Sequence, residues 1–190
     1  GGVLVTARLG VRDDLAADNV AAAVIPPPRK IAVLLVTPGN VFLEKELRTD
    51  PQVALEVRAP TGYQGGMEGF DVVVLDNVSL TRVGPGRFVL VNSAPGDVPL
   101  ELLGRADRPV ILDWDRDHPI MRHVDFSKVA VEDAARMRPL AAGKALVESS
   151  AGPLLYTLEE SRRKALFIGF DLFKTDFPLH VAFPLILSNA

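Results

Sequence analysis

Hydrophobic and polar positions alternate along the chain in blocks that predict an α/β fold. Residues 30–36 (KIAVLLV) form a continuous run of leucine and β-branched residues, which is typical of a strand buried on both faces of a parallel sheet. Asn40 then provides an N-cap for a helix. Further strands are expected over 53–57, 70–75 and 88–91. Strands joined by crossover connections predict a doubly wound, mostly parallel sheet with helices on both faces, in which 30–36 and 70–75 are adjacent and fully buried.

The second half of the chain is richer in short strands. We expect them over 110–112, 129–131, 145–148, 154–156 and 165–170, with some of them pairing antiparallel at one edge of the sheet. Residues 177–190 are apolar almost all round and contain Pro178 and Pro184. This pattern predicts a buried, kinked helix that packs against the sheet.

The first 28 residues form a separate segment. Residues 3–9 and 20–25 predict a β-hairpin, and three prolines at 26–28 then form a stiff linker. We therefore divide the chain into a hairpin and linker (1–28) and an α/β domain (29–190). Two strands cannot bury a core, so the hairpin either packs on the domain or is the tail of a preceding one. We favour the tail, and expect the 3–25 hairpin either to mediate a truncation-induced dimer or to be the most mobile part.

Composition narrows the possible functions. The chain has 48% hydrophobic and 24% charged residues, as folded proteins do, and a formal net charge of −3 with scattered basic residues. This argues against nucleic acid as a partner. The longest apolar runs, 31–36 and 181–187, are far too short to span a membrane, so we expect no membrane contact by this fragment itself. The absence of cysteine excludes a thiolate nucleophile, disulfides and Cys-ligated zinc.

Polar residues follow the strands where an α/β sheet would bind a ligand. Asp76-Asn77 and Asn92-Ser93 come after two expected strands, and Asp171 follows the last one. These residues could face one crevice at the carboxyl ends of the strands. Ser93 stands where a nucleophile elbow would lie, and of the three histidines, at positions 118, 123 and 180, its base would be His118 or His123. The alternative interpretation is an ordinary turn for Ser93 and backbone capping for Asp171, as for Asp176 before the closing helix.

An acidic segment, Asp113 to His118, has the residue types of a metal site, as do His123 and Asp125 downstream. Its spacing matches no ligand pattern. We interpret it as a solvated loop with Asp caps and Asp–Arg pairs over a packed Trp114, and expect no metal and no cofactor.

Several segments together resemble a known family. The order DDLAADNVAAAVIPPP, KIAVLLVTPGN, FDVVVLDN, HPIMRHVD and GFDLFKTDFPLHVAFPLILSNA is similar to bacterial membrane-anchored von Willebrand factor A proteins of the BatA or aerotolerance-regulator type. The resemblance implies the final hairpin of a β-sandwich followed by a class I glutamine amidotransferase-like domain, a flavodoxin-like three-layer fold. In that fold the cysteine elbow would fall near Asn92-Ser93, yet this chain has neither the cysteine nor the His-x-Glu pair, so the resemblance implies the fold without the activity.

The leading hypothesis is a non-catalytic scaffold or protein-interaction domain, with other proteins or other domains of the same chain as partners. The resemblance implies a fragment of a bacterial inner-membrane protein and favours its periplasmic side. The alternative hypothesis is a cryptic serine hydrolase or small-ligand sensor that uses Asp76, Asn92, Ser93 and Asp171 at the strand ends.

Overall fold

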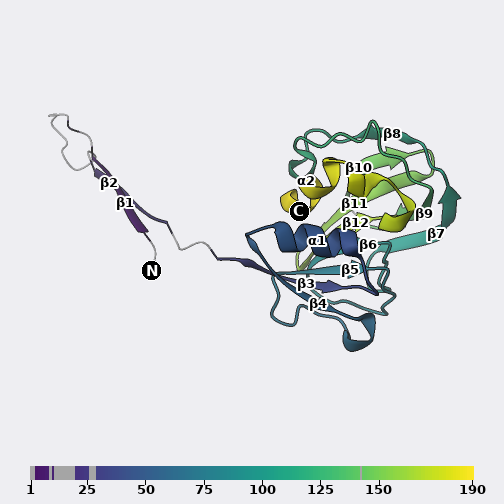
Figure 1. Ribbon diagram of the computed structural model, residues 1–190, viewed down its shortest axis with the longest axis horizontal. Helices are drawn as coiled ribbons and strands as arrows, with labels where there is room; N and C mark the ends of the chain where they lie inside the picture. The colour runs from purple at the N-terminus through teal and green to yellow at the C-terminus, as the bar shows by residue number, and fades with distance from the viewer. Residues whose placement is uncertain (1–2, 9, 11–19, 26–28, 142) are drawn as a thin grey trace. The chain divides into compact units, whose positions relative to one another are not determined.

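The computed structural model describes residues 3–8, 10, 20–25, 29–141 and 143–190 (Figure 1). The chain divides into two units, Gly1–Lys30 and Ile31–Ala190. In the first, β1 (Val3–Arg8) pairs antiparallel with β2 (Val20–Ile25), so the predicted hairpin is confirmed over these strands. Leu9, the turn at 13–19 and the prolines at 26–28 lie outside the described residues.

The second unit contains an eight-stranded mixed sheet in the order β4-β3-β5-β6-β12-β11-β10-β8. The parallel part comprises β4 (Val53–Arg58), β3 (Ile31–Val36), β5 (Val72–Asp76), β6 (Gly86–Val91) and β12 (Arg163–Ile168). The antiparallel part continues through β11 (Gly152–Glu160), β10 (Gly143–Ser149) and β8 (Ile111–Trp114). Antiparallel pairing at one edge is therefore confirmed. Residues 129–131 were expected to be a strand and are not, since only Val131 makes an isolated bridge, to Thr175.

Strands β3 and β5 are adjacent and parallel, as predicted, with Val33 opposite Val72. Full burial holds only for their carboxyl halves. Residues 33–36 and 73–76 are buried, whereas Ile31 is 42% exposed and Val72 is partly exposed. The prediction of complete burial is wrong at the amino ends, because Val72 borders an open cavity there.

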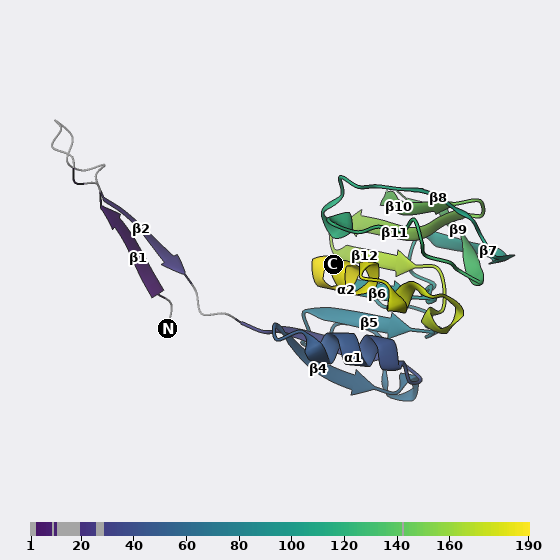
Figure 2. The same cartoon turned by 45° about the horizontal axis from the view of Figure 1, so that its top comes forward.

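The two α-helices of the described chain cover the same face of the sheet (Figures 1 and 2). Leu43 and Leu47 of α1 (Val41–Thr49) and Phe183 and Ile186 of α2 (Ala182–Asn189) belong to one apolar core. The opposite face is covered by loops and by a two-stranded ribbon of β7 (Leu100–Asp107) and β9 (Asp133–Pro139). The expectation of helices on both faces is therefore wrong.

The reason lies in the connections on the second face. Residues 59–71 contain four glycines and a proline, and 92–99 contain a glycine and two prolines, so neither segment has the uninterrupted apolar spacing of a helix. Tyr63, Val78, Val83 and Val98 instead fill this core from the loops. The layer therefore forms without α-helices.

The closing segment is helical over less of its length than expected. Its 3₁₀ turns η3 (Leu172–Lys174) and η4 (Phe177–Leu179) precede α2, and two similar turns, η1 (Pro60–Gly62) and η2 (Pro119–Met121), lie earlier in the chain. Pro178 lies in η4 and Pro184 lies in the first turn of α2, where a missing amide costs no helical hydrogen bond. The prolines thus start turns rather than kink one long helix. In the described residues, no helix is long and apolar enough to cross a membrane.

Candidate functional site

The parallel strands β3, β5, β6 and β12 end at one edge of the sheet, and this edge brings the predicted polar residues together. The backbone ladder continues past the strands, because Asn77 N donates to Val91 O (2.9 Å) and Asn92 N donates to Ile168 O (2.8 Å). Asn77 and Asn92 have left-handed backbone angles, with φ of 52° and 46°. Asparagine tolerates this region better than most residues, which explains its presence at both strand ends.

Asp76 is the buried centre of this edge, with 1% of its surface exposed. Its carboxylate accepts hydrogen bonds from Thr37 Oγ1 (2.6 Å), Asn40 Nδ2 (3.2 Å) and Asn77 Nδ2 (3.0 Å). Burial raises the pKa of the Asp76 carboxyl, and the negative charge of Asp171 adds to this rise. The three hydrogen bonds act in the opposite direction without cancelling it. Asp76 is therefore a buried acid with three neighbouring side chains donating to it.

Two of these neighbours were not predicted as site residues. Asn40 was expected to cap α1, and its Oδ1 does accept from Phe42 N and Leu43 N, both at 3.2 Å. Its amide group is left to donate to Asp76. Thr37 directly follows β3, in the same position that Asn92 has after β6, and this shared position was the signal available in the sequence.

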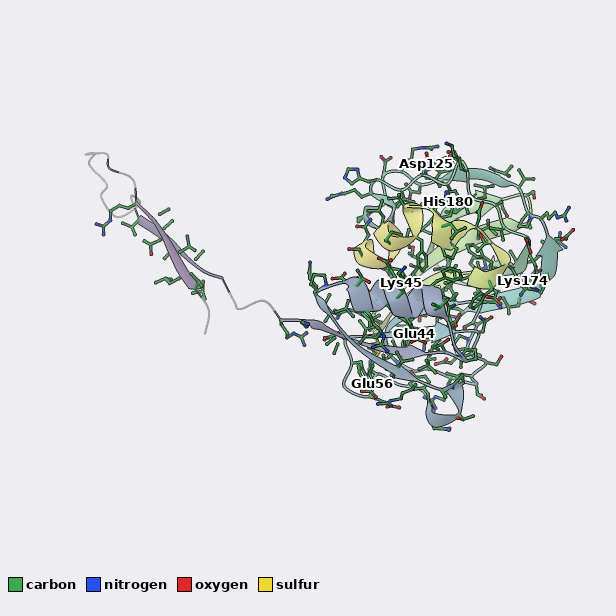
Figure 3. The ribbon with its side chains drawn as sticks, viewed as in Figure 1. Glu44, Lys45, Glu56, Asp125, Lys174 and His180 are labelled. Atoms are coloured by element: carbon green, nitrogen blue, oxygen red, sulfur yellow. The ribbon has the colours of Figure 1, made fainter. Side chains whose placement is uncertain are left out.

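The polar contacts continue from Asp76 toward the β7–β9 ribbon. Asn92 Nδ2 donates to Asn77 Oδ1 (2.6 Å), and Arg105 Nη1 donates to Asn92 Oδ1 (3.0 Å). Arg105 Nε binds both carboxylate oxygens of Asp133 at 2.8 and 2.7 Å, which lowers the pKa of that carboxyl. Lys174, labelled in Figure 3, approaches the same carboxylate at 3.3 Å. Arg105 and Asp133 were missed because the ribbon that carries them was not predicted.

Ser93 is buried, with 8% of its surface exposed, and is bonded to the backbone. Its Oγ accepts from Val78 N (2.9 Å) and donates to Val91 O (3.0 Å). Neither bond involves an imidazole. His118 instead accepts from Ile120 N through Nδ1 (3.2 Å), and His180 Nε2 lies 3.3 Å from Asp176 Oδ2. The hydroxyl therefore has the bonding of a structural turn residue.

The two aspartates near the end of the chain accept backbone hydrogen bonds, as the alternative interpretation expected. Asp171 caps η3 by accepting from Phe173 N (3.0 Å). Asp176 accepts from Ala130 N (2.8 Å) in a distant loop, and it precedes η4 rather than the closing helix.

The acidic segment has the Asp–Arg pairing that we interpreted from the sequence, but it is a loop only over 115–118, because Asp113 and Trp114 belong to β8. Arg116 pairs with Asp113 (2.9 Å), and its guanidinium lies 4.2 Å from the centre of the Trp114 ring. Asp115 accepts from Asp117 N (3.1 Å) and pairs with Lys144 (2.5 Å). Among the described residues, no group of three or more acidic or histidine side chains is arranged to hold a metal ion.

Three of the strand-end residues, Asp76, Asn77 and Asn92, are joined to one another by hydrogen bonds. Five cavities open elsewhere on the described surface, and none of the five is lined by Asp76, Asn77, Asn92 or Ser93. The expectation that these side chains face a crevice is therefore not met by any of these cavities. What the arrangement does is join α1, three parallel strands and the ribbon through hydrogen bonds.

Comparison with known proteins gives likeness in structure only. No protein-family model and no curated protein matches the sequence. The cytoplasmic protein STM3548 from Salmonella typhimurium matches with a TM-score of 0.63 and 12% identity, over 84% of this chain and 96% of that one. The cytoplasmic protein STM1381 from Salmonella typhimurium LT2 matches with a TM-score of 0.58 and 10% identity, over 100% of this chain and 94% of that one.

A GMP synthase subunit from Thermoplasma acidophilum matches with a TM-score of 0.51 and 11% identity, over 85% of this chain and 92% of that one. Identities this low carry the fold and not the activity. The chain therefore has a flavodoxin-like α/β fold, built on a mixed central sheet with few helices.

Proposed function

We propose that this chain is a non-catalytic scaffold and protein-interaction domain, degenerate relative to glutamine amidotransferases. The observation that carries the proposal is the bonding of Ser93, whose hydroxyl is engaged by Val78 N and Val91 O. A serine nucleophile needs a base within hydrogen-bond reach. Asn92-Ser93 occupy the position of the cysteine elbow of glutamine amidotransferases, and the sequence contains no cysteine that could act as the nucleophile.

The polar edge also supports a structural role. Asp76, Asn77 and Asn92 use their side chains to bond one another and their neighbours, at distances of 2.6 to 3.2 Å. Polar side chains bonded to one another hold a fold in one arrangement, and each of these three would have to break a bond to reach a substrate. These hydrogen bonds make the carboxyl-end edge of the sheet rigid.

The interaction surface that we assign is the hairpin. Val3, Val5 and Ala7 lie on one face of β1, and their partners on that face of β2 include Ala23 and Ala21. This face is apolar throughout these positions, and Val3 and Val5 are 63% and 46% exposed. Two strands with an uncovered apolar face are marginal alone, so we propose that they pair with strands of another domain or of a second copy.

The wider context rests on the resemblance to membrane-anchored von Willebrand factor A proteins. In that context the domain belongs to a larger bacterial inner-membrane protein, on the periplasmic side, and contributes to protein assembly rather than to chemistry.

Hydrolysis assays test the absence of catalysis. We would measure release of ammonia from glutamine and of p-nitrophenol from its acetate ester, with the wild-type chain, Ser93→Ala and the exposed control Ser161→Ala. We expect no turnover that depends on Ser93. Turnover lost in Ser93→Ala but kept in Ser161→Ala would show that the serine is catalytic and would overturn the proposal.

A small-ligand sensor is the second candidate, and one observation favours it. Asn77 and Asn92 both have left-handed backbones beside a buried acid of raised pKa, and such features gather at functional sites. Titration of the ¹⁵N-labelled chain with glutamine and glutamate tests it. Chemical-shift changes centred on Asn77 and Asn92, absent when alanine is added instead, would support a sensor over a scaffold.

A further inference from the structure

A cavity of about 290 Å³ opens at the other end of the parallel strands, on the face that carries the helices. Its apolar lining includes Val72 of β5, Val89 of β6, Leu166 of β12 and Ile120 of η2. Ligand pockets in proteins commonly measure about 300–1,000 Å³, so this cavity is of a size for a small molecule.

Two cations stand side by side over this apolar floor. Arg87 on β6 and Lys164 on β12 are directly opposite each other in the parallel ladder. Each precedes by two residues a core side chain of the helix-bearing face, Val89 or Leu166, so both point to that face. Neighbouring strands lie about 4.8 Å apart, and like charges placed opposite each other across them are destabilising.

Two residues with a carboxylate line this cavity, Glu159 and Ala190, the last residue of the 190-residue chain. Glu159, opposite Lys164 on β11, pairs with it at 2.6 Å. The side chain of Arg87 makes no hydrogen bond or ion pair with any residue that the structure describes, and the Asp71 carboxylate in the adjoining hollow accepts from Ala32 N (2.9 Å). The Arg87 guanidinium is therefore the cation of this cavity that has no ion pair among the described residues.

His118 adds a directed donor to the same cavity. Its Nδ1 accepts from Ile120 N at 3.2 Å, so the proton of the neutral ring is on Nε2. The cavity thus combines an apolar floor, an arginine side chain without an ion pair and a ring N–H donor on His118.

We propose that this cavity, bounded by Arg87, Lys164 and His118 above Val89 and Leu166, binds a small amphipathic carboxylate. The carboxylate accepts hydrogen bonds from the Arg87 guanidinium, a geometry that arginine supports with two parallel bonds. The apolar part lies along the valine and leucine side chains. This binding is independent of the scaffold function and uses the opposite end of the strands.

Octanoate is a suitable probe, with the full 190-residue chain labelled with ¹⁵N. We expect shift changes at residues 87–89, 118–120 and 164–166, and we expect Arg87→Gln to weaken binding about tenfold, as the loss of one charged hydrogen bond implies. Lys164→Gln should weaken it less, because Lys164 already has Glu159 as a partner. Arg136→Gln, an exposed arginine on β9, is the matched control and should bind as the wild type does.

Octylamine and octanol separate the head group from the chain. Octylamine should not bind, and octanol should bind more weakly than octanoate. Equal affinity of Arg87→Gln and wild type for octanoate, or shift changes centred away from this cavity, would overturn the proposal. Thermal melting of each variant verifies that it is folded before it is titrated.

Discussion

Replacing Asp76 with alanine should destabilise the protein by about 2–4 kcal/mol. The substitution leaves three donors, on Thr37, Asn40 and Asn77, without their acceptor. A buried donor left unsatisfied costs about 1–3 kcal/mol. Asn40 is completely buried and bears this cost in full, whereas the hydroxyl of Thr37 can rotate and Asn77 is only half-buried. The total therefore corresponds to one or two lost bonds rather than three.

Equilibrium unfolding in urea measures this loss as the difference in free energy of unfolding from the wild type. Asp107→Ala, at the exposed end of β7, is the control and should change the free energy of unfolding by less than about 0.5 kcal/mol. Asp76→Asn should cost less than Asp76→Ala, because its oxygen can still accept from Asn40 and Asn77. A loss below about 1 kcal/mol for Asp76→Ala would refute the view that this carboxylate holds the edge together.

Three further outcomes are expected. Folding raises the pKa of Asp76, so the stability that Asp76 contributes is present below its unfolded pKa and is lost as pH rises through its folded pKa. Across that pH window the wild type should therefore lose stability relative to Asp76→Asn. A difference in free energy of unfolding between the two that is constant with pH would contradict this. Ser93→Ala should lose about 1–2 kcal/mol in urea unfolding because Val78 N loses its acceptor, and a loss beyond about 3 kcal/mol would mean a different environment. Val5→Lys places a charge on the apolar face of the hairpin and should abolish self-association measured by sedimentation velocity. Thr6→Lys, on the opposite face of the hairpin, is the control. Dimers that persist in Val5→Lys would exclude the Val5 face of the hairpin as the contact.

The parallel half of the fold was accessible from the sequence because its strands are continuous apolar runs. Residues 33–36 and 73–76 are buried on both faces, so almost no polar position interrupts the signal. The ribbon gave no such signal. Leu102 and Leu103 of β7 are 51% and 53% exposed, so β7 has no apolar run that ends in a core. In β9 the alternation of apolar and polar residues covers only 135–138, which is too short to mark a strand by itself.

The candidate site was predictable in position but not in its connections. Asp76, Asn77 and Asn92 follow strands whose direction the pattern indicated, and parallel strands end at one edge. Which donors reach Asp76 depends on the turn after β3, where Asn40 caps the helix and bonds the acid with the same side chain. The contact of Asn92 with Arg105 depends on the packing of the ribbon, which has no local trace in the sequence.

The carboxyl ends and the amino ends of the parallel strands should respond differently to mutation. At the carboxyl ends, side chains bond one another, as Asn92 bonds Asn77, and substitutions there should register as changes in folding. At the amino ends, the side chain of Arg87 has no ion pair or hydrogen bond among the described residues, and its substitution should leave folding unchanged. α/β sheets ordinarily place their variable, ligand-selecting positions at the carboxyl ends. In this chain, Arg87 is a position of this kind at the opposite, amino ends of the strands.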